Sequence, residues 1–181
     1  SPDSAATITS CFYLLVKYSE VTPKSFLCKG DSGVSEFKLA EYATDPRVGN
    51  KELIDVWDFG GDPMSHCSYS YHLPFDLFAL TTSSSPGMAV AADPNPWQET
   101  SSRAGRPVAD KDQALTGLVV SSTTEQARRC NATTHQDEGQ NVLFLDSHVE
   151  FAKRPTCGIN DDNIYTHVDG SSRTSGGPPN V

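Results

Sequence analysis

Two histidines and an aspartate flank an apolar run near the C-terminal end of the chain, in the segment THQDEGQNVLFLDSHVEFAK. Imidazole and carboxylate groups are ligands of zinc and related metals, so His135, Asp146 and His148 are a candidate transition-metal site. Asp146, however, lies in a predicted turn, where aspartate is common because its side chain bonds to the nearby backbone. Ten residues separate it from His135. A turn aspartate and two histidines at the rim of a hairpin are the favoured interpretation.

The apolar run itself predicts a β-hairpin. With Asp146–Ser147 as a two-residue turn, strands at 141–145 and 148–152 pair with each other. Alternate residues of a strand share a face, and so do opposed residues of the two strands. This register places four apolar side chains on one face, namely Val142, Phe144, Val149 and Phe151. His148 and Glu150 lie on the other.

A second candidate is the segment CKGDSGV, which begins at Cys28. It resembles the nucleophile loop of chymotrypsin-like serine proteases, in which Ser32 would attack the substrate. In that family the catalytic histidine and aspartate precede this loop by a long stretch of chain. Here only 27 residues precede Cys28, and none is histidine. A turn of small and polar residues is favoured over a hydrolase, since a triad needs a partner for the serine.

The segment CGINDDNIYTHVDG concentrates oxygen ligands between Cys157 and Gly170. Carboxylates and backbone carbonyls gathered in one loop are what Ca²⁺ requires. The donors are Asn160, Asp161, Asp162, Asn163 and Asp169. Their spacing is not that of an EF-hand, and turns stabilised by Asp and Asn side chains are the alternative. Upstream, Asn131 begins a formal glycosylation triplet, NAT, of a kind that also arises by chance.

Composition limits the range of functions. A formal net charge of −9 and a pI near 4.9 argue against nucleic acid as a partner, because phosphate binding needs clustered Lys and Arg. The pair Arg128-Arg129 is expected in a solvated turn. The 181 residues suit one domain, and 13 glycines and 12 prolines indicate long loops. No run of 18 apolar residues is present, and we expect the chain to be a processed or truncated piece, since it starts at Ser1 without methionine.

The five cysteines, at positions 11, 28, 67, 130 and 157, include no C-x-x-C pair, so zinc ribbons and thioredoxin-like sites lack support. Wide spacing in a chain rich in Gly, Pro and Ser favours an oxidising compartment with disulfides. We predict Cys130–Cys157, because these residues flank the paired strands, with Cys11–Cys28 as the alternative.

Hydrophobic periodicity predicts the remaining elements. Residues 4–18 have apolar side chains at helical spacing and are followed by Pro23, so a helix is expected there. A short helix is expected over 35–43. Strands are expected at 68–75, 87–93 and 116–122, and residues 93–107 form an extended loop.

The hairpin segment HQDEGQNVLFLDSHVEF resembles the C-terminal signature of type II secretion pseudopilin-like proteins, and the following CGINDDNIYT resembles their tail. VTPKSFLCKGD, SYSYHLPF and MAVAADPNPW are similar to upstream segments of the same group, so the likeness covers about residues 8–167. Two features depart from it. Ser147 stands where the family has glycine, and the gap between His135 and Asp146 is one residue longer.

The resemblance implies a pilin-like α+β fold, in which an N-terminal α-helix packs on a mostly antiparallel sheet with long loops. It also implies a structural, non-enzymatic subunit of a secretion or envelope filament, extracytoplasmic and anchored in the inner membrane by a helix that this chain lacks. Its partners would be other pilin-like subunits or envelope proteins. Major pseudopilins hold Ca²⁺ in a C-terminal loop, which at matching positions implies Asp161, Asp162 and, less closely, Asp169.

We therefore expect one domain over residues 1–170 and a flexible tail over 171–181. The alternative function is an extracytoplasmic ligand- or partner-binding module. It would use the loop around Trp97 and the aromatic segment 68–75, since exposed Trp and Tyr are common anchors at recognition surfaces.

Overall fold

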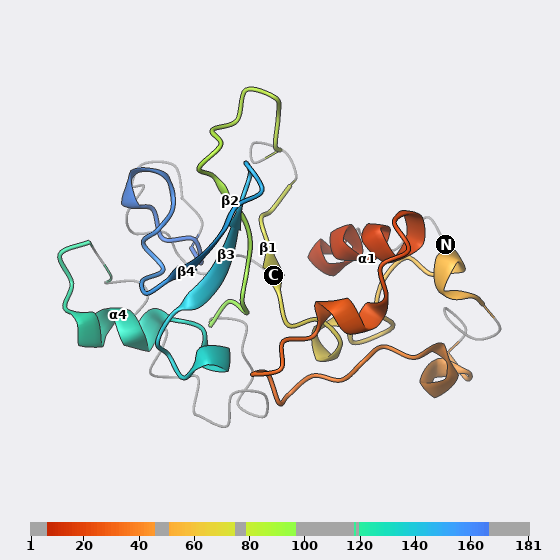
Figure 1. Ribbon diagram of the computed structural model, residues 1–181. Coiled ribbons are helices and arrows are strands. Elements are labelled where there is room, and N and C mark those ends of the chain that lie inside the picture. Colours follow the sequence, from red (N-terminus) through yellow and green to blue (C-terminus); the bar gives the residue numbers. More distant parts are fainter. Residues whose placement is uncertain (1–6, 46–50, 75–78, 97–117, 119, 167–181) are drawn as a thin grey trace.

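The structure is a computed structural model that describes residues 7–45, 51–74, 79–96, 118 and 120–166. These form an α+β fold with a four-stranded antiparallel sheet in the order β1-β2-β3-β4. The strands are β1 (Ser70–Tyr71), β2 (Ala89–Ala92), β3 (Gln140–Phe144) and β4 (Val149–Ala152). Helix α1 (Ile8–Tyr18) lies beside the β1 edge of the sheet, and helix α4 (Thr124–Cys130) lies on the β4 side (Figure 1).

Helix α1 confirms the helix expected near the N-terminus. Thr7 caps it, because its hydroxyl accepts a hydrogen bond from the amide of Ser10 at 3.1 Å. The helix buries Phe12, Tyr13 and Val16 against short 3₁₀ turns and β1. The residues before Thr7 that were expected to belong to it lie outside the described ranges.

An aromatic cluster forms the core beneath α1. Phe59 is at its centre and meets the rings of Tyr13 and Phe26 edge-on, with centroids 4.9 and 5.2 Å apart. The hydroxyl of Tyr13 donates to the carbonyl of Leu53 at 2.9 Å, so the one polar group of this ring is satisfied. A separate cluster lies under the sheet and comprises Ala92, Val142, Phe144, Ala152 and Tyr165.

The hairpin of β3 and β4 is confirmed, but the predicted register is wrong by one residue. Leu143 pairs with Val149, and Asn141 pairs with Phe151. A shift of one residue moves a whole strand's side chains to the opposite face. Val149 and Phe151 are therefore on the outer face, with 64% and 44% of their surface exposed, and the apolar face keeps only Val142 and Phe144.

The turn explains the shift. It contains three residues, Leu145 to Ser147, instead of two, and the amide of Ser147 donates to the carbonyl of Phe144 at 2.9 Å. Only Ser147 has a left-handed backbone, with φ at +73°. A type I turn followed by one left-handed residue is the usual three-residue hairpin loop, whereas the predicted two-residue turn needs two left-handed residues.

Two strand predictions are confirmed as the shorter β1 and β2. The helix expected over 35–43 is a single 3₁₀ turn, Leu39–Tyr42. Of the strand expected at 116–122, the described residues are not in a strand, and the rest lies outside the described ranges, as do most of the loop 93–107 and the tail 171–181. Arg128 and Arg129 are exposed, as expected, but they lie in the last turn of α4, a helix that was not predicted.

Both disulfide predictions are wrong, because all five cysteines are thiols. Cys130 is buried in a small cluster with Leu118 and Ala127, and its Sγ lies 3.3 Å from the carbonyl oxygen of Gln126 in its own helix. It therefore serves as a small apolar residue of α4.

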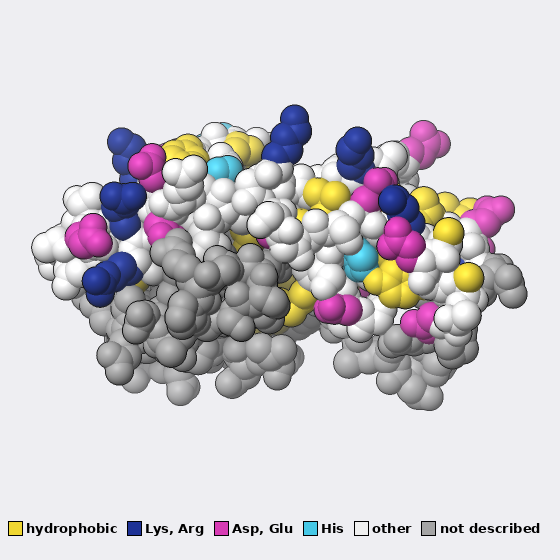
Figure 2. Space-filling view, turned by 90° about the horizontal axis from the view of Figure 1, so that it is seen from below, with side chains coloured by type: hydrophobic (Ala, Val, Ile, Leu, Met, Phe, Trp, Pro, Cys, Tyr) yellow, Lys and Arg dark blue, Asp and Glu magenta, His cyan; other side chains and the backbone are white. Residues whose placement is uncertain are grey.

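The described surface carries charges of both signs. Figure 2 shows Lys and Arg side chains interspersed with Asp and Glu on one face, so the cations do not form a continuous patch there. No helix in the described part of the chain has the length and apolar character needed to span a bilayer.

Candidate functional site

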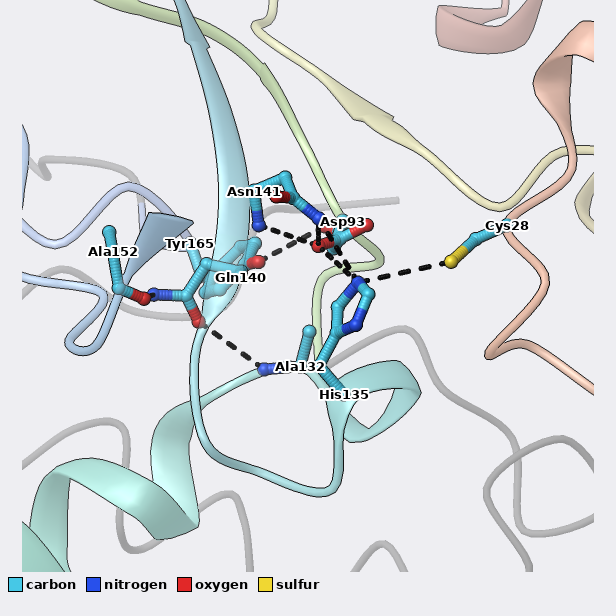
Figure 3. A network of polar contacts seen from close by, with 8 residues as sticks. All are labelled: Cys28, Asp93, Ala132, His135, Gln140, Asn141, Ala152 and Tyr165. Carbon is cyan, nitrogen blue, oxygen red and sulfur yellow. Dashed lines mark hydrogen bonds and ion pairs between the residues drawn. The ribbon is translucent and has the colours of Figure 1, made fainter. Parts of the chain in front are cut away.

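His135 lies at the meeting point of three segments that are far apart in the sequence (Figure 3). Its Nε2 is 3.0 Å from Oδ2 of Asp93 and 3.9 Å from Sγ of Cys28. The same nitrogen is 3.1 Å from Nδ2 of Asn141. Within the described ranges, Cys28, Asp93 and His135 are the one group of three in which a thiol, a carboxylate and an imidazole nitrogen all lie within 4.8 Å of one another.

The sheet positions Asp93. This residue directly follows β2, and its amide donates to the carbonyl of Asn141 at 3.1 Å, which continues the β2–β3 ladder by one residue. Asp93, Asn141 and Phe151 therefore form a row across the outer face. The hydroxyl of Tyr165 donates to the carbonyl of Asp93 at 3.0 Å and holds the strand end in place.

The carboxylate of Asp93 is unevenly satisfied. Oδ2 accepts the backbone amide of Asn141 at 2.6 Å and its side-chain amide at 3.1 Å. Oδ1 is buried and has no hydrogen-bond partner. The side chain has no exposed surface. Burial raises the pKa of the Asp93 carboxyl, although the bonds from Asn141 and the charge of His135 act in the opposite direction.

Buried amides fix the loop that carries His135. The side chain of Asn131 donates to the carbonyls of Asp137 and Lys153, at 2.9 and 3.0 Å. Gln140 donates to the carbonyl of Ala152 at 2.9 Å. The ring of Phe151 meets the imidazole of His135 edge-on at 5.8 Å. The outward position of Phe151, which the sequence register did not predict, thus supports the site.

Cys28 reaches His135 because two loops touch. A Cβ atom on Gly30 would lie 2.2 Å from the carbonyl oxygen of Thr134, so only glycine allows this approach. Cys28 begins the same turn, since its carbonyl accepts the amide of Asp31 at 3.0 Å. The close contact of Gly30 with Thr134 therefore places the thiol beside the neighbouring His135.

The site is accessible from one side. A shallow hollow of about 350 Å³ is lined by Thr134, His135, Gln136, Glu138 and Phe151. The side chain of His135 is 29% exposed, whereas that of Asp93 is fully buried. A small solute can therefore approach the imidazole while the carboxylate stays out of water.

The geometry does not form a catalytic relay. In a nucleophile–histidine–acid relay, the nucleophile and the acid bind opposite nitrogens of the imidazole ring. Here Sγ of Cys28 and Oδ2 of Asp93 both approach Nε2 of His135. Three potential ligand atoms within 4.8 Å of one another are instead a group that could surround a metal ion.

The other histidine of the opening segment is not part of this site. His148 stacks on Phe144 with the ring centroids 4.4 Å apart, and its ring nitrogen contacts the carboxylate of Asp146. Asp146 also accepts the backbone amide of His148 at 3.2 Å. This bond to the nearby backbone is the turn role expected of Asp146, and it lowers the pKa of the carboxyl. Of His135, Asp146 and His148, only His135 belongs to the group with Cys28 and Asp93.

The other functional residues predicted from the sequence are not part of the site formed by Cys28, Asp93 and His135. Ser32 is exposed on its turn, two residues beyond Gly30. Asn131 is fully buried, so the glycosylation triplet is closed to an enzyme. Asp161 and Asp162 lie at the end of a 3₁₀ turn, Ile159–Asp161, and Asp169 falls outside the described residues. Neither Asp93 nor Cys28 was predicted as a ligand from the sequence. A polar residue directly after a buried apolar strand was the available signal for Asp93.

Comparison with protein-family models, with curated proteins and with solved structures finds no match for this chain.

Proposed function

We propose that this chain is the soluble domain of a pilin-like subunit, a non-enzymatic structural protein that assembles with similar subunits in an extracytoplasmic filament or envelope complex anchored in the inner membrane. The observation that supports this proposal most is helix α1, which carries apolar side chains on both its inner and outer sides.

The inner side of α1 is buried in the aromatic core. On the outer side, Leu14, Leu15 and Tyr18 are 43%, 44% and 68% exposed. Tyr18 is a neighbour of both leucines on the helix surface, because it follows Leu14 by four positions and Leu15 by three. A helix that is apolar on both sides is suited to packing between two partners. One partner is the core of this chain, and we propose that the other is the α1 of an adjacent subunit.

Trp57 lies beside α1 and extends the exposed apolar surface of the helix. Trp57 is 60% exposed, and the ammonium of Lys17 lies 4.0 Å from the centroid of its ring. Such a cation–π contact holds the indole beside the helix. The outer side of α1 and Trp57 together form what we call the α1 surface, comprising Leu14, Leu15, Tyr18 and Trp57.

We extend the proposal to calcium, which would order the loop from Cys157 to Gly170. Asp161 is exposed, and both Asn160 and Asp161 have a left-handed backbone, with φ at +55° and +61°. A cation among carboxylates and backbone oxygens would stabilise this turn.

The alternative of a ligand-binding module gains no support from the described residues. Tyr69 and Tyr71, the two tyrosines of segment 68–75, pack against the core cluster under α1. The ring of Tyr71 lies edge-on to Phe12 at 5.1 Å. Both tyrosines are thus half-buried against the core, and Phe75 and Trp97 fall outside the described ranges.

Photo-crosslinking in cells that express the protein tests the assembly proposal. A photoreactive residue replaces Leu15 on the α1 surface or, as the control, Leu73, which is similarly exposed at 40% but lies elsewhere. We expect adducts with copies of this chain or with other pilin-like subunits, identified by mass spectrometry, from position 15 only. Equal yields at both positions, or none at 15, would refute the proposal.

A further inference from the structure

The contacts of Nε2 of His135 with Asp93 and with Asn141 cannot both be hydrogen bonds at the same time. Nε2 of a neutral imidazole either carries a proton or accepts one. If it donates to Asp93, then the Asn141 amide, 3.1 Å away, faces a second donor. If it accepts from Asn141, then the lone pairs of Nε2 and of the Asp93 carboxylate face each other at 3.0 Å. In the first state three donors converge on Oδ2 of Asp93 while Oδ1 has none, and in the second state two lone pairs face each other.

A cation between these atoms removes the conflict. It takes the lone pair of Nε2 together with that of the carboxylate, and the Asn141 amide then keeps its bond to Oδ2 of Asp93. The buried Oδ1 of Asp93, which has no hydrogen-bond partner, is independent evidence that this carboxylate lacks a partner. A buried carboxylate oxygen without a donor is costly, because it has lost its hydrogen bonds to water.

We propose that Sγ of Cys28, the carboxylate of Asp93 and Nε2 of His135 bind a divalent transition-metal ion, for which zinc is the best match. A thiolate excludes Ca²⁺ and Mg²⁺, which take oxygen ligands. A set of one sulfur, one nitrogen and one oxygen suits zinc, and three protein ligands leave a fourth position for water on the exposed side.

The distances suit this ion. Zinc bonds of about 2.0–2.1 Å to nitrogen or oxygen and about 2.3 Å to sulfur give tetrahedral edges of about 3.4 and 3.6 Å. The corresponding distances here are 3.0 Å from Nε2 to Asp93 and 3.9 Å from Nε2 to Cys28. Each of these two edges needs to change by a few tenths of an ångström only, and the third edge, from Sγ of Cys28 to the carboxylate of Asp93, is at most 4.8 Å. The partly exposed His135 provides the path by which the ion enters.

The surroundings hold the ligands as a metal site requires. The amides of Asn141 bond to the coordinating carboxylate, and the close contact of Gly30 with Thr134 fixes Cys28. Loss of such supporting groups typically weakens metal binding by about 10–100-fold. The site is independent of the proposed filament role, since it lies on the outer face of the sheet and uses no residue of the α1 surface.

Titration of the full chain with Co²⁺, followed by displacement with Zn²⁺, tests the site. We expect one Co²⁺ per chain, with the near-ultraviolet charge-transfer band of a cobalt–thiolate bond. The band should disappear in Cys28→Ser and Cys28→Ala. Affinity should fall by more than about 100-fold in His135→Gln, beyond the loss typical of supporting groups. Cys11→Ser and His148→Gln are the matched controls and should leave the charge-transfer band and the metal affinity unchanged.

A pair of glycine variants tests the geometry without altering a ligand. Gly30→Ala places a Cβ against Thr134, whereas the same change at Gly87 meets no atom within 4 Å. We expect about 10–100-fold weaker Zn²⁺ binding in Gly30→Ala and no change in Gly87→Ala. Circular dichroism confirms that each variant is folded. A wild-type protein without the band, a band that persists in Cys28→Ser, or equal affinities in the two glycine variants would overturn the proposal.

Discussion

The replacement of Phe144 and, separately, of Phe151 by alanine tests the register of the β3–β4 hairpin. Both are phenylalanines on adjacent strands of the same hairpin, so the two substitutions delete the same atoms. In the structure Phe144 lies on the inner face, with 6% of its surface exposed, and Phe151 lies on the outer face, with 44% exposed. The two-residue turn predicted from the sequence would put both on one buried face.

The expected costs follow from burial. Phe144 packs with Val142, Ala152 and Tyr165, and its removal leaves a cavity under the sheet. Phe→Ala changes at such positions cost about 3–5 kcal/mol. Phe151 buries only part of its ring and leaves no enclosed cavity. Scaling the about 1.5–3 kcal/mol for full burial of an apolar side chain by that part gives about 1–2 kcal/mol.

Urea unfolding of the two variants, measured by circular dichroism with a chelator present, provides the assay. The chelator matters because Phe151 contacts His135 and its loss would also disturb a bound metal. We expect Phe144→Ala to be less stable than Phe151→Ala by about 2 kcal/mol, which corresponds to about 4–8 °C in Tm for a chain of this size. The denaturant slope should stay that of the wild type.

Equal destabilisation by the two changes, at an unchanged slope, would refute the assigned register. It would mean that Phe151 is as deeply buried as Phe144 and that the turn has two residues. The pairs that bring Asp93, Asn141 and Phe151 into one row would then be wrong as well.

Three further predictions concern single sites. Because burial raises the pKa of Asp93, the metal-free wild type should lose stability relative to Asp93→Asn as pH rises from the ordinary aspartate pKa through the raised one. Urea unfolding across that pH range measures the loss, and a parallel pH dependence of the two proteins would contradict it. Zn²⁺ should stabilise the wild type alone. Ser147→Gly should raise the free energy of unfolding by up to about 1 kcal/mol, because glycine adopts the left-handed backbone at φ +73° without strain, and a midpoint below that of the wild type would show that the turn differs. Millimolar Ca²⁺ should raise Tm of the wild type more than that of the double variant Asp161→Asn/Asp162→Asn, and a melting curve that does not respond would rule out calcium in this loop.

Local patterns predicted the elements well where periodicity is strong. The N-terminal helix, the two middle strands and the hairpin segment were all found from the spacing of apolar residues. The register was missed because Ser147 adopts a left-handed backbone, which turns a two-residue loop into one of three. A serine gives little indication of this, whereas a glycine at the same position would have.

The site was found only in part. His135 was named from its segment, but Cys28 and Asp93 come from segments 107 and 42 positions earlier in the chain. Local periodicity carries no information on which loops meet. Cys28 also lay within a protease-like motif that directed attention to Ser32, and the contact of Gly30 with Thr134 became visible only in the fold. His148 was correctly assigned to the rim of the hairpin, with its partner Asp146 in the turn.

X-ray absorption at the zinc edge tests the central claim most directly. The protein is loaded with Zn²⁺, freed of excess metal, and measured beside Cys28→Ser. We predict one sulfur neighbour at about 2.3 Å and two or three nitrogen or oxygen neighbours at about 2.0–2.2 Å in the wild type, with the sulfur lost in the variant. A first shell of nitrogen and oxygen alone in the wild type would contradict the site formed by Cys28, Asp93 and His135.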